Sequence, residues 1–367
     1  MRKHVPLLRG LAILAVVCNH ATGWGYTAMF WWTHRYRQVS SLPNYDQLGS
    51  LPYYGLVVIQ QLALFSVPAF LFISGYFVAY AARGDSPALS WKIVRSQITH
   101  LLWPYLVWSL VIFIGDGVQG KRYSLVQYVG QLVTGGAVPA YFFVPLLCQF
   151  YLLSPLIARW GKTRGSLLIA VSVFIQLAAT APAYLPLLGV ALPLVVYTSG
   201  WLFIWQALYF PLGVVCGFHY SRLKPWLARV KWGLLAATVV FGVLSILESE
   251  ALYRAGFNDG WVRGGFRFSA ALYAVAFVLS FLAFDEISIP FARAISHLGT
   301  RSYGIYLLHP KILELVARAI YHVAPWVLAH QVVYQPLLVV SGVGIPLLFM
   351  NCAMKSRAKK FAHYLFG

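Results

Sequence analysis

Two ionisable residues lie in the first apolar segment of the chain, Arg9 and His20 within the stretch 5–23. Their spacing is close to three helical turns, so both side chains fall on one helix face, about 16 Å apart along the axis at about 1.5 Å per residue. A guanidinium grips phosphate through paired hydrogen bonds, and a neutral imidazole accepts a proton from an alcohol. Because ionisable side chains are costly inside a bilayer, the pair predicts a polar site within the membrane.

Each residue also has a purely structural explanation. Arg9 could extend to the inner membrane surface and His20 to the outer one, with their apolar atoms left in lipid. That explanation suffices for Arg9 alone, whereas two such residues on one face favour a shared site. We therefore predict that His20 is a catalytic group and that Arg9 belongs to the same site.

Further polar candidates lie in the second apolar segment and in the loop after it. Ser74 lies near the end of that segment, where its hydroxyl can satisfy backbone groups freed by a bend. Lys92 and Arg95 are three residues apart in the next loop and share a helix face. With Arg9 they form a predicted phosphate-binding cluster, although ordinary positive charge at the inner surface explains Lys92 better.

A late apolar segment carries a possible secondary site made of Ser302, Tyr306, His309 and Glu314. His309 lies inside the predicted span, and the sequence fits a satisfied core histidine and a second member of the polar site equally well. Glu314 and Arg318 are four residues apart, so they can also form a simple ion pair on one helix face.

Composition excludes a soluble globular protein, since 60% of the 367 residues are hydrophobic, 10% are charged and the mean hydropathy is +0.71. The net charge of +19 does not indicate nucleic-acid binding, because the basic residues lie in short loops between apolar runs. No metal is expected and no disulfide framework is predicted, because the four cysteines are far apart in apolar stretches. These are Cys18, Cys148, Cys216 and Cys352.

The apolar runs predict an all-α, polytopic membrane protein of about ten transmembrane helices, forming a single domain over 1–367 with no appended soluble domain. Of the 28 Lys and Arg residues, 18 fall on the side of the two termini, 7 on the other side and 3 within spans. This asymmetry predicts cytoplasmic termini in the cell membrane. The apolar stretch 185–200 could be re-entrant or interfacial. The predicted spans are 5–23, 56–81, 98–115, 137–158, 166–184, 201–221, 231–248, 267–287, 302–322 and 332–353.

Five sequence elements, in this order, resemble the acyltransferase-3 family of membrane acyltransferases, and the resemblance extends over nearly the whole chain. Two positions depart from the family pattern. Tyr141 stands where a tryptophan is usual, and Lys92 stands where an arginine is usual. A lysine ammonium makes a single point contact with phosphate, whereas a guanidinium makes a forked one. The five elements are Arg9 with His20; the stretch Pro68–Tyr76; Lys92, Arg95 and Pro104; Tyr141-Phe142-Phe143 with Tyr151 and Pro155; and Ser302–His309.

The resemblance implies an enzyme that takes an acyl group, commonly acetyl, from a cytoplasmic acyl-CoA donor. The acceptor would be a hydroxyl of a glycan, a lipid-linked sugar or another cell-envelope molecule. His20 would act as general base or acyl relay, while Arg9, Lys92, Arg95 and Ser74 would hold the donor. The sequence identifies no donor of hydrogen bonds for the thioester oxygen.

Two other functions remain open at the level of sequence. A transporter or flippase for a lipid-linked or sugar substrate also needs a polar track through the bilayer, although repeated halves are not visible here. An oligomeric structural protein explains least of the Arg9 and His20 placement. The sequence predicts neither the oligomeric state nor the acceptor. The tryptophans and tyrosines of the outer segments do not identify the acceptor, because such residues also form the interfacial belt of membrane proteins.

Overall fold

The computed structural model describes residues 5–82, 89–190, 200–284 and 290–367, and within these ranges the regular elements are helices without any strand. The α-helices are α1 (Val5–Tyr26), α2 (Leu51–Leu62), α3 (Ser66–Ala81), α4 (Trp91–Val118), α5 (Leu125–Thr134), α6 (Phe143–Thr163), α7 (Gly165–Thr180), α9 (Tyr209–Arg254), α10 (Asp259–Arg263), α11 (Phe268–Ala283), α12 (Ala292–Thr300), α13 (Ser302–Val323), α14 (Gln331–Lys355) and α15 (Ala362–Phe366).

Eight helical stretches of the described chain are long and apolar enough to cross a membrane, which shows a multi-pass membrane protein. The expected count of ten differs for two reasons. The stretch Tyr209–Arg254 counts once, although its backbone leaves helical geometry at His219. The helix α13 is long enough, but it carries Lys311, Glu314 and Arg318 and is not among the eight stretches. The count of ten and the cytoplasmic termini therefore stay predictions.

Several predicted spans are built from more than one helical piece. The expected span 56–81 is α2, one turn of 3-10 helix at Ala63–Phe65, and α3. The expected span 201–221 starts with a 3-10 turn at Phe203–Gln206 and becomes α-helical only at Tyr209. In the stretch 185–200, a 3-10 helix ends at Leu188, and the part 191–199 lies outside the described residues, so its predicted re-entrant or interfacial character stays a prediction.

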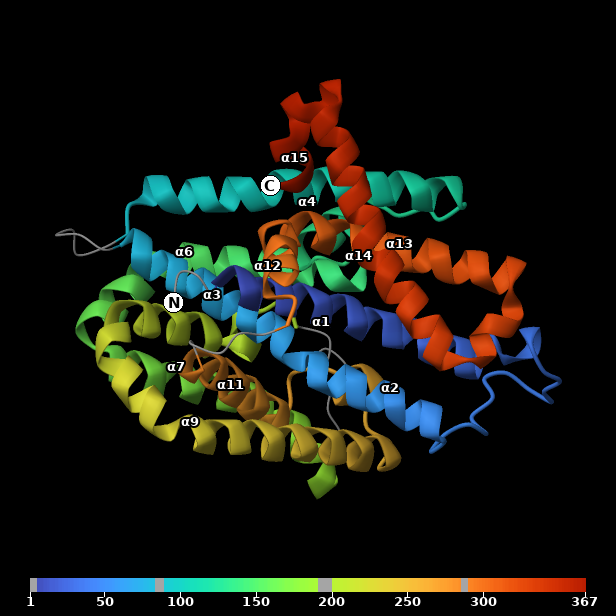
Figure 1. The fold of residues 1–367 in the computed structure, drawn as a ribbon, viewed down its shortest axis with the longest axis horizontal. Coiled ribbons are helices and arrows are strands. Elements are labelled where there is room, and N and C mark those ends of the chain that lie inside the picture. The colour runs from blue at the N-terminus through green and yellow to red at the C-terminus, as the bar shows by residue number, and fades with distance from the viewer. Residues whose placement is uncertain (1–4, 83–88, 191–199, 285–289) are drawn as a thin grey trace.

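Helix α1 runs through the middle of the bundle (Figure 1). It packs against α2, α3, α12, α13 and α14, and α4, α13 and α14 lie on one side of it in this view while α9 and α11 lie on the other. The helix carries Arg9, Asn19 and His20, which are costly to expose to lipid. Its central position encloses all three.

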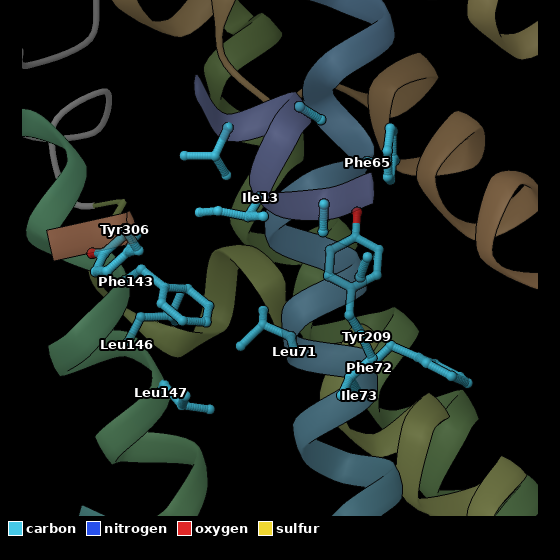
Figure 2. Close-up of a cluster of buried hydrophobic side chains, with 14 of the residues drawn as sticks. Ile13, Phe65, Leu71, Phe72, Ile73, Phe143, Leu146, Leu147, Tyr209 and Tyr306 are labelled. Carbon is cyan, nitrogen blue, oxygen red and sulfur yellow. The ribbon is translucent and has the colours of Figure 1, made fainter. Parts of the chain in front are cut away.

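A layer of apolar side chains joins α1 to its neighbours. Figure 2 shows Ile13 of α1, Leu71 and Phe72 of α3, and Phe143 and Leu146 of α6 in one cluster of buried apolar side chains. Ile13, Leu71 and Leu146 are fully buried. This packing fixes the helices that border the candidate site described below.

Glycines permit two close helix crossings. A side chain on Gly75 of α3 would overlap the Phe210 carbonyl of α9, and one on Gly213 of α9 would overlap the Phe72 carbonyl of α3. Small residues allow such approach in membranes, where helices gain little from burying apolar surface. In the same way, Gly10 and Gly299 bring α1 against α12.

We predict that Gly213→Ala destabilises the protein by about 1–3 kcal/mol, since the new methyl must push α3 and α9 apart. The matched control is Gly233→Ala on the same helix, where a Cβ meets no atom within 4 Å. Thermal unfolding of both variants in the same detergent checks the prediction. Equal midpoints for Gly213→Ala and Gly233→Ala would contradict it.

Candidate functional site

A cavity of about 1610 Å³ follows α1 along most of its length. Arg9 and His20 both line it, as their common helix face predicts. Residues of α2, α3, α6 and α13 line it beside α1, and residues of α4, α14 and α15 line the end near Arg9. The cavity continues past the end of α1 to Arg263 of α10. We call its two extremes the Arg9 end and the Tyr26 end.

Two contacts set α13 in register beside α1. The Arg9 guanidinium donates a hydrogen bond of 3.1 Å to the Ser302 hydroxyl. About three turns further along α1, the His20 ring lies 5.2 Å from the His309 ring, centroid to centroid. Both helices therefore run in the same direction, and two members of the possible secondary site, Ser302 and His309, join the primary one.

Arg9 has polar neighbours and no acidic one. Tyr151 of α6 interacts with both the Arg9 guanidinium and the Ser74 hydroxyl, and Ser74 also donates to the Phe70 carbonyl over 2.8 Å. Among the described residues, Arg9 forms no ion pair with a carboxylate. An enclosed guanidinium without a carboxylate favours an anionic ligand.

His20 borders the cavity, while His309 lies behind it and is fully buried. The Nδ1 atom of His309 is 3.2 Å from the Ile305 carbonyl oxygen, so Nδ1 carries the proton that this contact requires. The other ring nitrogen, Nε2, is buried and has no partner in the described structure. A bare acceptor is therefore available beside the His20 ring.

Aromatic rings line the cavity between the levels of Arg9 and His20. Tyr306 lies one turn after Ser302 and one turn before His309 on α13. Its hydroxyl donates to the Ala140 carbonyl over 2.5 Å, and its ring meets Phe143, which meets Phe70, at centroid distances of 5.8 and 5.9 Å. These three side chains form what we call the aromatic collar.

The other predicted residues lie apart from this cavity. Lys92 and Arg95 line a separate shallow depression, which shares His100 with the Arg9 end of the cavity. Glu314 pairs with Lys311 at 2.8 Å and with Arg318 at 3.1 Å, so the simple ion pair that its spacing allowed is present. Glu314 does not line the cavity.

Sequence reasoning missed several lining residues. Asn19 borders the cavity next to His20, and its amide can donate hydrogen bonds. The Tyr26 end also contains Gln60 of α2 and Asp259 and Arg263 of α10, which lie far from α1 in the sequence. An asparagine before the histidine was visible as a polar residue in an apolar run, whereas the other three needed the tertiary fold.

The aromatic residues that the sequence places in the predicted outer segments divide into two groups. Tyr26 and Trp31 line the cavity. By contrast, the Trp24 ring packs on the Trp32 ring at a centroid distance of 5.5 Å, and Trp261 is buried in a separate apolar cluster with Leu252 and Val262. A membrane belt therefore does not account for Tyr26, whose ring faces the cavity.

A family model described as an acyltransferase domain matches residues 5–351 of the chain. No curated protein and no solved structure matches the chain. The matched range includes every predicted site residue and the cavity lining up to Met350.

Proposed function

The chain belongs to the acyltransferase-3 family, and we propose that this membrane acyltransferase transfers an acyl group, commonly acetyl, from acyl-CoA to a hydroxyl of a glycan or other cell-envelope acceptor. The observation that carries the proposal is one cavity that holds, at two depths, a histidine and an arginine without a carboxylate partner among the described residues. Such a cavity lets a donor and an acceptor meet inside the bilayer while each enters from its own side.

The donor enters at the Arg9 end, which is the cytoplasmic side in the proposed orientation. Arg301 and His100 line this end together with Arg9. In the described part of the chain, Arg301 bonds the Asn351 amide oxygen and no carboxylate. Phosphates of CoA would find cationic partners there. Lys92 and Arg95, in the adjoining depression, would hold the more distant phosphate outside the cavity, with Ser74 beside Arg9.

His20 acts as the general base. Its ring takes the proton of the acceptor hydroxyl while the oxygen attacks the thioester carbonyl carbon. The tetrahedral intermediate then collapses, the carbon–sulfur bond breaks, and the proton passes from His20 to the departing CoA thiolate. The Asn19 amide lies beside this position and can donate to the carbonyl oxygen as its negative charge develops.

His309 is a positioning residue for His20. With Nδ1 bound to the Ile305 carbonyl, its bare Nε2 accepts the ring N–H of His20 after a small rotation of either ring. This fixes the tautomer of His20, so that the nitrogen facing the cavity carries the lone pair. The same contact stabilises the imidazolium that forms when the acceptor is deprotonated.

A flippase or transporter remains the second candidate, because the cavity borders α1 from Arg9 to Tyr26 and could pass a polar substrate. Purified protein decides between the two functions. Acyl transfer or CoA release from acetyl-CoA in detergent supports the enzyme, whereas substrate movement across liposomes without CoA release supports the transporter.

We predict that His20→Ala lowers acyl transfer by about a hundredfold to ten-thousandfold, the usual contribution of a general base. Donor binding and the unfolding temperature should stay close to wild type, because one side of the ring faces the cavity. The residual activity should also lose the decline in rate at acidic pH. Transfer by purified His20→Ala at near wild-type rate would remove the assignment.

We predict that Arg9→Ala weakens acyl-CoA binding by about tenfold to a hundredfold, since hydrogen bonds to charged groups contribute about 1.5–3 kcal/mol. Arg9→Lys should rescue only part of this, because it loses the fork. The paired variant Lys92→Ala/Arg95→Ala is the comparison and should have a smaller, salt-sensitive effect. Unchanged turnover of Arg9→Ala at every donor concentration would exclude Arg9.

We predict that His309→Leu lowers kcat by about tenfold, the rate equivalent of one hydrogen bond of about 1.4 kcal/mol. The donor KM should not change, since His309 does not border the cavity. His309→Gln offers an acceptor oxygen and should recover part of kcat. A structural role alone would instead lower stability in both variants and leave kcat per folded molecule unchanged.

A further inference from the structure

We propose that the Tyr26 end of the cavity is a subsite for an uncharged, hydroxyl-rich sugar ring of the acceptor, and that it discriminates against acidic sugars. This inference rests on the proposed function and goes beyond it by assigning the charge class of the acceptor. It depends on Tyr26, Tyr253, Asp259 and Arg263, all of which line the cavity.

The subsite lies within reach of His20. Tyr26 is six residues beyond His20 on the same helix, which is about 9 Å at about 1.5 Å per residue. A sugar ring held beside Tyr26 can therefore direct a hydroxyl towards His20. The backbone of Gly264 and Gly265 also forms part of the wall, leaving room for the ring.

Arg263 is held in place before any acceptor binds. Its guanidinium carbon lies 4.2 Å from the Tyr26 ring centroid and 4.6 Å from that of Tyr253, and its Nε donates to Asp259. Its side chain is 11% exposed, whereas that of Asp259 is 63% exposed. The pair therefore offers both guanidinium N–H donors and a second carboxylate oxygen, which accepts hydroxyl protons.

Stacking surfaces complete the recognition of a sugar. Phe30 packs against Tyr45 at 5.1 Å, and both line the cavity together with Trp31, which is 53% exposed. A sugar ring has an apolar C–H face and a rim of hydroxyl groups. Aromatic rings take the face while the Asp259–Arg263 pair takes the rim.

Charge balance favours a neutral acceptor. At the Tyr26 end, Asp259 neutralises Arg263. A carboxylate or phosphate on the acceptor would meet the exposed carboxylate of Asp259. At the Arg9 end, by contrast, Arg9 and Arg301 bind Ser302 and Asn351, which carry no charge. Three arginines that do not line the cavity also pair with carboxylates, namely Arg37–Asp46, Arg254–Glu250 and Arg267–Glu248.

Direct binding to the full chain in nanodiscs tests the subsite by calorimetry. The acidic probe is oligogalacturonate, and its matched neutral probe is the oligogalactoside of equal length and α linkage that reduction of its carboxyl groups yields; β-linked oligosaccharides of glucose and N-acetylglucosamine are further neutral probes. We expect at least one neutral probe to bind about tenfold more tightly than oligogalacturonate. Tyr26→Leu should weaken the binding of this neutral probe. Asp259→Asn should bring the preference close to unity, because it leaves the positive charge of Arg263 unbalanced.

Glu250→Gln is the matched control. It removes the same charge from another Arg–carboxylate pair spaced by four residues, and Glu250 does not line the cavity. The preference for neutral probes should survive this change. Equal or tighter binding of oligogalacturonate, absence of binding by all neutral probes, or an identical response to Asp259→Asn and Glu250→Gln would each overturn the inference.

The acyl-transfer assay and the binding assay test different hypotheses, the proposed enzyme and the sugar subsite, and their outcomes can be told apart. Neutral-sugar binding that responds to Asp259→Asn, combined with no CoA release from acetyl-CoA, would leave the subsite intact and disprove the proposed enzyme. Acyl transfer to acidic sugars as efficient as to neutral ones would preserve the enzyme and disprove the subsite.

Discussion

The arrangement of this protein depends on the cost of placing the polar face of α1 against lipid. Arg9, Asn19 and His20 all border one cavity, so other helices must enclose that face from end to end. Glycine contacts make the enclosure tight: Gly10 brings α12 against α1, and Gly75 and Gly213 lock α3 to α9. The cavity is therefore bounded by helices that cannot easily separate.

The sequence was sufficient for those features that depend on one helix. Apolar runs predicted the membrane helices, and the spacing of Arg9 and His20 predicted their common face. The sequence could not predict that His309 lies beside His20, because this follows from the register of α13 on α1. The sequence also could not predict that Lys92 and Arg95 line a separate depression, because this depends on how α4 packs against the other helices.

The two ends of the cavity differ in how their arginines are partnered. Arg9 bonds a serine, whereas Arg263 bonds an aspartate and stacks between tyrosines. In the proposed reaction, the first arrangement suits a polyanionic donor and the second an uncharged acceptor. The same residue type thus serves opposite purposes, and the difference comes from neighbours contributed by α10 and α13 and not from the arginines themselves.

The aromatic collar has a consequence for the electrical insulation of the membrane. A water-filled passage beside α1 would conduct ions and dissipate the membrane potential. Phe70, Phe143 and Tyr306 line the passage between the levels of Arg9 and His20. Rings of this kind disfavour a continuous column of water, so hydrated ions meet a dewetted barrier. In the proposed reaction, a short acyl group carries no charge and would cross the same barrier at little cost.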